Sequence, residues 1–380
     1  MKIGKWALAS LAFLPLLAGC AGFWDAPSSS TTTTTTTLSS GYFYVLDATD
    51  SQLISYYISS GALKQVANIA LPAKPLAMAM APNGEFLYVS TYSGIYLYTV
   101  SSGTMTLESS SALVNDEATA LAVDSTNSWL IEGYGNNGTI YLNAIPVSSS
   151  TGAATGASAV SVYVNGSNTG AALNQIAFSP NNDFLFAAIG SYGTVAYDFT
   201  ASSSSPLSAG TVTAPVSSSG AALSVAVDPS NRMVYVGESA AVNSSGGLRS
   251  FTFKAGSNGP VLSSVSTISS GGSGPYAILP KATGNVVYVA NWNGTSSGKI
   301  TAFSISASGT SYALAQLSAT ASTGIKPSSM VEDSDSNFVL VENAGGSPYL
   351  DAYIFDTTTS TTLDLTLYDS TYSGIAVAAQ

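Results

Sequence analysis

Four carboxylates lie near corresponding points of a repeated sequence pattern, where they could converge, and are the side chains best placed to do chemistry: Asp47, Glu132, Glu238 and Glu342. Two carboxyl groups whose pKa values are pushed apart can serve as general acid and general base. A pair held roughly 5 to 10 Å apart is the arrangement that hydrolyses glycosides. A hydrolase that works through such a pair is therefore one activity to consider for this chain.

The residue types that the chain lacks exclude several other sites. The 380 residues contain no histidine and a single cysteine, Cys20. A Ser-His-Asp or Cys-His arrangement needs an imidazole, and zinc prefers imidazole and thiolate ligands. We therefore assign no catalytic residue from a motif and expect no metal and no cofactor. Because no side chain of ordinary pKa then titrates between about pH 5 and 8, we expect ligand binding to change little over that range.

One acidic segment resembles the first half of a calcium-binding loop through Asp333, Asp335 and Asn337. Phe338 and Ala344 stand where such a loop has its glycine and its bidentate glutamate. The segment also aligns with turn residues elsewhere in the chain. We interpret it as a hairpin turn.

The elements that position these residues come from a phrase that recurs along the chain. Residues 80–90, MAPNGEFLYVS, read as a strand end, a tight turn and a second strand. Seven versions of the phrase lie about fifty residues apart, and such a period indicates a propeller or another repeat array. The residues at the Val89 position of successive copies are Val45, Val89, Glu132, Ala187, Val236, Val289 and Val341.

Each copy contains short β-runs separated by turn residues, and no segment has a sustained helical period. The pattern predicts an all-β fold, a seven-bladed β-propeller of four-stranded antiparallel blades over residues 41–380. The first copy lacks its opening strand, and the residues from Thr371 to the C-terminus supply one. We therefore expect the C-terminal strand to complete the N-terminal blade and close the ring. Rings of six or eight blades, or a string of β-sandwiches, are the alternatives.

Residues 1–19 have the layout of a secretory signal peptide, in which two lysines precede an apolar run that ends in small residues. The letters LAGC, which end at Cys20, resemble the lipobox of bacterial lipoproteins. A Ser/Thr-rich stretch completes a linker over residues 20–40. We expect lipidation of Cys20 and an anchor in the bacterial cell envelope. Because Ala21 is not an aspartate, the outer membrane is the expected location. An ordinary secreted protein with a chance cysteine is the alternative.

The charge balance limits the partners of this chain. It has 10 Lys and Arg against 21 Asp and Glu, a net charge of −11. Nucleic-acid binding needs clustered basic residues, so we expect no nucleic-acid partner. The same sign disfavours adhesion to anionic lipid head groups. We expect a monomer that contacts the membrane through its lipid anchor and binds an envelope protein or a carbohydrate.

Several phrases resemble the YVTN and lactonase-like family of seven-bladed propellers. Pro75 leads to the turn Pro82-Asn83-Gly84 and the strand FLYV, and Pro275 leads to the strand VYVAN that ends at Asn291. The resemblance spans residues 41–380 and implies the fold. Family members that hydrolyse 6-phosphogluconolactone are thought to use histidines and arginines around the channel mouth. In this chain the residues after the blade-start prolines are Leu76, Tyr276 and Ser328, and Arg232 and Arg249 lie in a turn and on a strand.

Ligands of such propellers usually meet the loops after the second strands, around one mouth of the channel. The candidates at those points are Asp47, Tyr92, Tyr134, Tyr192, Glu238, Asn291, Trp292, Glu342 and Asn343. Carboxylates, amides and aromatic rings suit neutral sugars or peptides, although each could instead be an ordinary solvated loop residue. We expect a lipid-anchored extracytoplasmic binding or scaffold module. The alternative is a hydrolase, either a divergent lactonase-like enzyme related to the 6-phosphogluconolactonases or a carboxylate-pair enzyme.

Overall fold

The computed structural model describes residues 39–136, 138–156, 159–165, 171–208, 210–294, 296–346, 348–355, 363–369 and 374–380. The predictions for the signal peptide, for Cys20 and for most of the linker fall outside these residues. Ser39–Gln380 forms one compact unit. Within the described ranges, no helix is long and apolar enough to cross a membrane.

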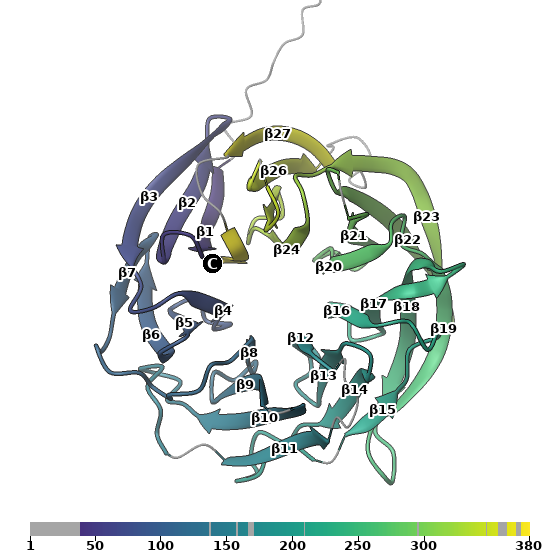
Figure 1. The fold of residues 1–380 in the computed structure, drawn as a ribbon, viewed down its shortest axis with the longest axis horizontal. Helices are drawn as coiled ribbons and strands as arrows, with labels where there is room; N and C mark the ends of the chain where they lie inside the picture. Colours follow the sequence, from purple (N-terminus) through teal and green to yellow (C-terminus); the bar gives the residue numbers. More distant parts are fainter. Residues whose placement is uncertain are drawn as a thin grey trace, which may run out of the picture. The chain divides into compact units, whose positions relative to one another are not determined.

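The unit is a ring of seven antiparallel sheets, each with four strands, as Figure 1 shows. We number these sheets as blades 1 to 7 along the chain. Their innermost strands, in blade order, are β28 (Gly374–Ala379), β4 (Pro75–Met80), β8 (Ala120–Val123), β12 (Leu173–Phe178), β16 (Ala222–Val227), β20 (Gly274–Pro280) and β24 (Pro327–Glu332). The second strands are β1 (Ser39–Asp47), β5 (Phe86–Thr91), β9 (Trp129–Asn136), β13 (Phe184–Ile189), β17 (Val234–Val242), β21 (Val286–Trp292) and β25 (Phe338–Asn343).

The outer half of each blade is a hairpin of the third and fourth strands. The third strands are β2 (Gln52–Ser59), β6 (Gly94–Ser101), β10 (Thr139–Pro146), β14 (Gly193–Asp198), β18 (Ser245–Lys254), β22 (Lys299–Ser308) and β26 (Leu350–Phe355). The fourth strands are β3 (Ala62–Ala70), β7 (Thr104–Leu107), β11 (Ala159–Asn165), β15 (Thr211–Thr213), β19 (Val261–Ser269), β23 (Ser311–Ser322) and β27 (Leu363–Asp369). The predicted class, blade number and strand number are confirmed.

Blade 1 joins the two ends of this unit. The C-terminal strand β28 pairs with β1, from Phe43 opposite Ala379 to Asp47 opposite Gly374. The last residue adds a side-chain link, because the Tyr44 hydroxyl donates to Gln380 Oε1 at 2.9 Å. The predicted closure of the ring is therefore confirmed, and neither six or eight blades nor a string of sandwiches describes this chain.

The core lies between the blades. The strands β5, β13 and β25 are buried along their whole length. Each apolar cluster combines side chains of two consecutive blades; for example, Tyr88 of blade 2 packs with Leu130 of blade 3. Each blade therefore needs its neighbours to cover its apolar faces, as repeated sheets of this size do.

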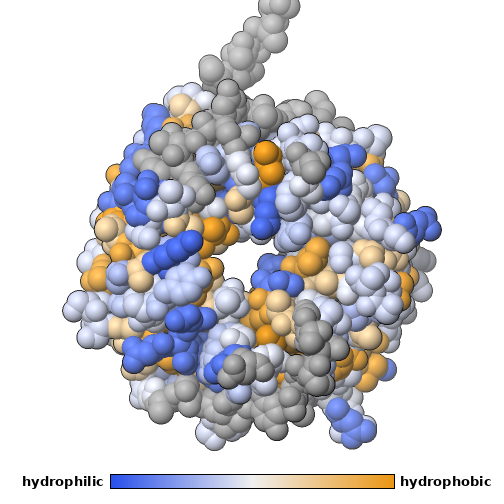
Figure 2. Space-filling model, in the orientation of Figure 1, coloured by the Kyte–Doolittle hydropathy of each residue, from blue (hydrophilic) through white to orange (hydrophobic). Residues whose placement is uncertain are grey.

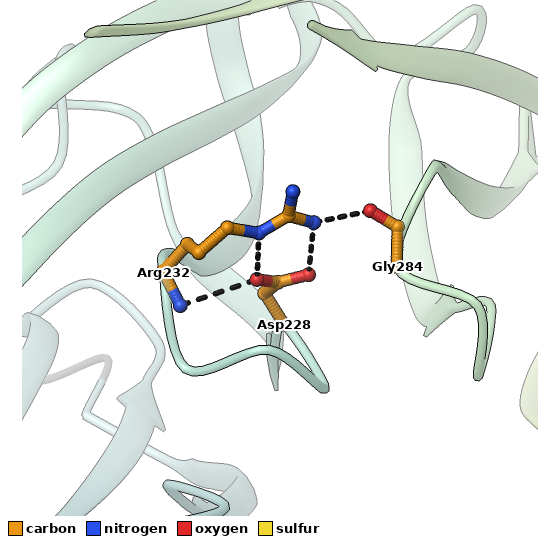
Figure 3. Close-up of polar contacts among 3 residues, drawn as sticks. All are labelled: Asp228, Arg232 and Gly284. Carbon is orange, nitrogen blue, oxygen red and sulfur yellow. Dashed lines mark hydrogen bonds and ion pairs between the residues drawn. The ribbon is translucent and has the colours of Figure 1, made fainter. Parts of the chain in front are cut away.

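The recurring phrase forms the hairpin between the innermost and second strands. In blade 5, Asp228 begins this turn and accepts hydrogen bonds from Arg232 Nε at 2.6 Å and Nη2 at 2.8 Å. The same guanidinium group also donates to the carbonyl oxygen of Gly284, in the corresponding turn of blade 6 (Figure 3). Arg232 therefore joins two adjacent blades.

The acidic segment of blade 7 is such a turn. Asp333 Oδ1 accepts hydrogen bonds from the backbone N–H groups of Asn337 and Phe338, at 2.8 and 2.7 Å. The chain reverses with Ser336 at a φ of 56°, and Gly84 holds the equivalent place in blade 2 at 71°. A left-handed residue at this place explains why Asn, Ser and Gly recur there.

Candidate functional site at the channel mouth

We define the upper end of the ring as the end at which the second strands terminate. The innermost strands begin there and surround an opening that stays free of side chains in Figure 2. In six blades the pairing of the innermost strand slips by one residue at this end, which is a β-bulge. The residues left without a strand partner, which we name the bulge ring, are Ile375, Leu76, Asn174, Leu223, Tyr276 and Ser328. All six are at least partly exposed.

The polar candidates from the sequence lie beneath the upper loops. Five of them are at most 1% exposed: Asp47, Glu238, Asn291, Glu342 and Asn343. Asn291 Nδ2 donates to the carbonyl oxygen of Ser270 at 2.7 Å, and Glu238 Oε1 accepts from the N–H of Val216. Asp47 Oδ1 accepts from the N–H of Thr49 at 2.8 Å. These side chains therefore hold loops in place from below, which gives them a structural role whatever else they do.

The aromatic candidates divide by exposure. Tyr92 is 54% exposed and is the most open of them. Tyr192 is half-buried against the apolar cluster of blades 3 and 4. Tyr134 stacks on Tyr141, with ring centroids 5.3 Å apart and planes 18° from parallel. The fourth, Trp292, lies in a separate group of residues on blades 6 and 7.

The four carboxylates that opened the sequence analysis belong to blades 1, 3, 5 and 7. Although all four lie in the described part of the chain, no hydrogen bond joins any two of them. Glu238 instead pairs with Arg249, whose Nη1 lies 2.7 Å from Oε2. Asp47 and Glu342 share one neighbour, Gly374, which pairs with Asp47 and packs against the Glu342 side chain. Among the described residues, no group of three or more His, Cys, Asp or Glu is placed to hold a metal ion.

Glu342 has a partner that the sequence analysis did not propose. The hydroxyl of Ser328, a member of the bulge ring, donates a hydrogen bond to Glu342 Oε2. Ser328 is partly exposed, whereas Glu342 is fully buried and its Oε1 has no hydrogen-bond partner within the described residues. A nucleophile joined to a shielded base is a recurring arrangement in covalent catalysis.

Burial raises the pKa of the Glu342 carboxyl group to about 8. The hydrogen bond from Ser328 and the positive charge of Lys326 act in the opposite direction, and burial outweighs them. A general base works best when its pKa lies near the working pH. Ordinary pKa values predict no titrating side chain near neutral pH in this chain without histidine. The raised pKa places the titration of Glu342 in that range.

A cation that acts electrostatically on Glu342, Lys326, connects this pair to two aromatic rings. Lys326 Nζ lies 6.0 Å from the ring centroid of Trp292, and that ring lies 6.1 Å from the ring of Tyr276. Lys326 has a φ of 58°, and the N–H of Ala344 donates to its carbonyl oxygen at 2.9 Å. Left-handed non-glycine residues concentrate at functional sites.

We name the five residues Tyr276, Trp292, Lys326, Ser328 and Glu342 the mouth cluster. The sequence analysis proposed Trp292 and Glu342 as ligand-binding residues, whereas it gave the other three no role. One signal was present, because Tyr276 and Ser328 each follow a proline at the start of a blade. The bulge turns the residue after that proline out of the strand ladder.

Comparisons with known proteins agree with this architecture. The family model described as "Lactonase, 7-bladed beta-propeller" matches residues 209–363. Among curated proteins, none matches the sequence. A candidate 6-phosphogluconolactonase of Bacteroides uniformis superposes with a TM-score of 0.71 at 16% identity, covering 89% of this chain and 99% of that one. A periplasmic gluconolactonase of Pseudomonas aeruginosa gives 0.69 at 17%, covering 89% and 98%.

A second candidate 6-phosphogluconolactonase, from Bacteroides fragilis, gives a TM-score of 0.72 at 14% identity and covers 90% of this chain and 98% of its own. At such low identity these likenesses concern the fold. The protein is a seven-bladed β-propeller of lactonase-like architecture.

Proposed function

We propose that this propeller hydrolyses lactones of neutral sugar acids and that the mouth cluster is its active site. The observation that carries the proposal is the hydrogen bond from the accessible Ser328 to the buried Glu342. The similarity to proteins described as gluconolactonases and 6-phosphogluconolactonases supports a lactone as the substrate class. The same similarity favours hydrolysis over the binding or scaffold role expected from the sequence.

The reaction uses the two residues in turn. The Glu342 carboxylate takes the Ser328 proton while Ser328 Oγ attacks the lactone carbonyl carbon. The ring C–O bond then breaks, the departing oxygen takes the proton from Glu342, and an ester to Ser328 remains. In the second half, Glu342 takes a proton from water, the resulting hydroxide displaces Ser328, and Ser328 regains the proton. The sum is one lactone and one water converted into one hydroxy acid.

Lys326 and the aromatic rings complete the site. The ammonium group of Lys326 acts electrostatically on Glu342 and stabilises the oxyanion that forms during each half-reaction. Tyr276 and Trp292 provide apolar surface for the face of a sugar ring. A phosphate is best held by arginine forks, but Arg232 and Arg249 are already committed to ion pairs with Asp228 and Glu238. The site therefore favours an unphosphorylated lactone.

The test is a hydrolysis assay on residues 21–380. The initial rate with δ-gluconolactone and with its phosphorylated form is followed by a pH indicator, after subtraction of spontaneous hydrolysis. We expect faster turnover of the neutral lactone. Ser328→Ala and Glu342→Gln are each expected to lower kcat about 100-fold, as loss of a nucleophile or base does. In the wild type, rapid acid quenching should trap a protein heavier by the mass of one lactone.

Ser219→Ala is the matched control. Ser219 is an exposed serine at the upper end whose hydroxyl forms a hydrogen bond with that of Ser217. Its substitution should leave the rate unchanged. A wild-type protein that fails to exceed the spontaneous rate, or a Ser328→Ala variant that retains the full rate, would contradict the proposed function.

We also propose that the propeller is lipid-anchored at the outer membrane. The support is the sequence pattern that ends at Cys20, together with the absence of a second cysteine to pair with it. Replacement of Cys20 with serine should release the protein from the membrane fraction, because the lipid thioether can no longer form. Retention of Cys20→Ser in membranes after a carbonate wash would contradict the anchor.

A further inference from the structure

A groove lies between blades 5 and 6 at the lower end of the ring, which is the end opposite to the mouth cluster. Its volume is about 580 Å³, and grooves of this size commonly hold small molecules. Blade 5 contributes the turn before β17, the end of β18 and the start of β19, and blade 6 contributes the turn before β23 and the start of that strand. Hydroxyl groups form much of the lining, on Ser230, Thr252, Ser263, Thr310 and Tyr312.

Two positive charges line this groove, and none of its described lining residues is acidic. Arg232 belongs to the turn before β17, and Lys254 is the exposed last residue of β18. These cations stand out in a chain that has 10 Lys and Arg against 21 Asp and Glu. Charges more than about 8 Å apart are largely screened at physiological ionic strength. A ligand in the groove is therefore affected more by these two cations than by the net negative charge of the chain.

The guanidinium group of Arg232 is held in place with one nitrogen left over. Nε and Nη2 donate to the buried Asp228, and Nη2 also donates to the carbonyl oxygen of Gly284. Nη1 has no hydrogen-bond partner within the described residues and points away from both groups, as Figure 3 shows. The side chain is 24% exposed, so a ligand can reach this nitrogen. Asp228 offsets the charge of Arg232, and Lys254 leaves the groove positive overall.

Blade 2 provides an internal comparison, because a groove of the same volume lies at its lower end. The residue after the left-handed turn residue is Glu85 in blade 2 and Arg232 in blade 5. The last residue of the third strand is Ser101 in blade 2 and Lys254 in blade 5. The fold therefore produces a groove at this place in more than one blade, and the sequence of blade 5 makes its groove positive.

We propose that the groove between blades 5 and 6 binds a sugar that carries a carboxylate group. Arg232 Nη1 and the ammonium group of Lys254 donate to the carboxylate. The ring of Tyr312 has its centroid 5.9 Å from the guanidinium carbon of Arg232 and provides a surface for one face of the sugar ring.

The remaining lining and the free nitrogen favour this class of ligand. The lining hydroxyl groups can donate and accept hydrogen bonds, as the hydroxyl groups of a sugar do. Because Asp228 already uses Nε and Nη2, Arg232 offers a single nitrogen, which suits the single charge of a carboxylate better than the double charge of a phosphate. The site does not depend on the proposed lactone hydrolysis, because it lies at the opposite end of the ring and shares no residue with the mouth cluster.

The test is an NMR titration of residues 21–380 at pH 7 and low ionic strength. The probes are the disaccharides of galacturonate and of mannuronate, each compared with its methyl ester, which has the same rings and no charge. We expect at least one of the acids to bind, and its ester to bind about tenfold more weakly. Lys254→Glu should weaken binding of the acid about tenfold, and added salt should weaken it in the wild type.

Two control variants show whether the binding belongs to this groove. Lys64→Glu makes the same change of charge at an exposed residue of β3 in blade 1 and should leave the affinity unchanged. Glu85→Gln, in the groove of blade 2, should also leave it unchanged. The proposal would be overturned if neither acid binds, if an acid and its methyl ester bind equally, or if Lys254→Glu has the same affinity as Lys64→Glu.

Discussion

Replacement of Glu342 with glutamine should destroy the proposed base and yet make the folded protein more stable at alkaline pH. The Glu342 carboxyl group has an ordinary pKa of 4.5 when unfolded and a pKa raised by burial to about 8 when folded. The folded state therefore holds a proton that the unfolded state releases, and stability falls as pH rises between these values. The slope is about 1.4 kcal/mol per pH unit, so about 4 kcal/mol is lost by pH 8.

Glutamine does not ionise and so removes this loss. Its carbonyl oxygen can still accept the hydrogen bond from Ser328, but its NH₂ group occupies the position where Oε1 has no partner. An unpaired buried donor costs about 1–3 kcal/mol. The variant should therefore be less stable than wild type at pH 5 and more stable by about 2 kcal/mol at pH 8.

Urea unfolding at one-unit steps from pH 5 to 9 measures this difference. The wild-type and variant curves of unfolding free energy against pH should cross between about pH 5 and 7. Glu108→Gln, at an exposed residue directly after β7, is the control and should run parallel to wild type. If Glu342→Gln also runs parallel to wild type at every pH, the raised pKa of this group is wrong, and with it the assignment of Glu342 as a base near neutrality.

Three further outcomes test the fold and the site. Deletion of residues 374–380 removes β28 and the hydrogen bonds that Gln380 makes to Tyr44 and Gly84. Because several buried residues are lost, the truncated protein should melt more than roughly 10 °C below wild type, or fail to fold, when followed by circular dichroism. Arg232→Ala breaks the bidentate ion pair with buried Asp228 and should lower the free energy of unfolding by about 1–3 kcal/mol in urea titrations. This range is below that of a fully buried pair because Arg232 is partly exposed. Lys254→Ala, on the exposed end of β18, should leave the free energy of unfolding unchanged. The value of kcat/KM for δ-gluconolactone should increase with pH up to about 8, where Glu342 becomes ionised, and a profile that is flat from pH 5 to 8 would exclude this group as the base.

The sequence predicts the fold of this chain well because its signals are local. Turn residues such as Gly84 and Asn231 adopt positive φ angles, and each is followed within a few residues by a strand that is largely buried. The lone strand at the C-terminus has a single unpaired place to occupy, next to β1. These features need only spacing and turn chemistry, both of which can be read from one sequence.

The candidate sites depend on contacts that spacing does not encode. Ser328 meets Glu342 because a bulge displaces it from the ladder of β24, and Tyr312 meets Arg232 across the boundary between two blades. The sequence analysis instead chose candidate ligand-binding residues at a fixed number of residues after the recurring phrase. Those positions are the ends of the second strands, where the polar side chains lie buried under the loops. Burial is also what raises the pKa of Glu342, and ordinary pKa values do not contain that information.

The bulge ring separates the chemistry of the mouth from the strand register of the blades. A bulged residue has no partner opposite it in the second strand, so its side chain can change without altering the register of its blade. The existing set, which contains Ile, Leu, Asn, Tyr and Ser, already shows that unlike side chains fit this position. A library that varies only the six bulged residues would therefore sample new specificities on a constant scaffold. Ser328→His and Tyr276→His are the first substitutions to make, because each follows a proline at the place where the lactonase-like family is thought to carry its histidines.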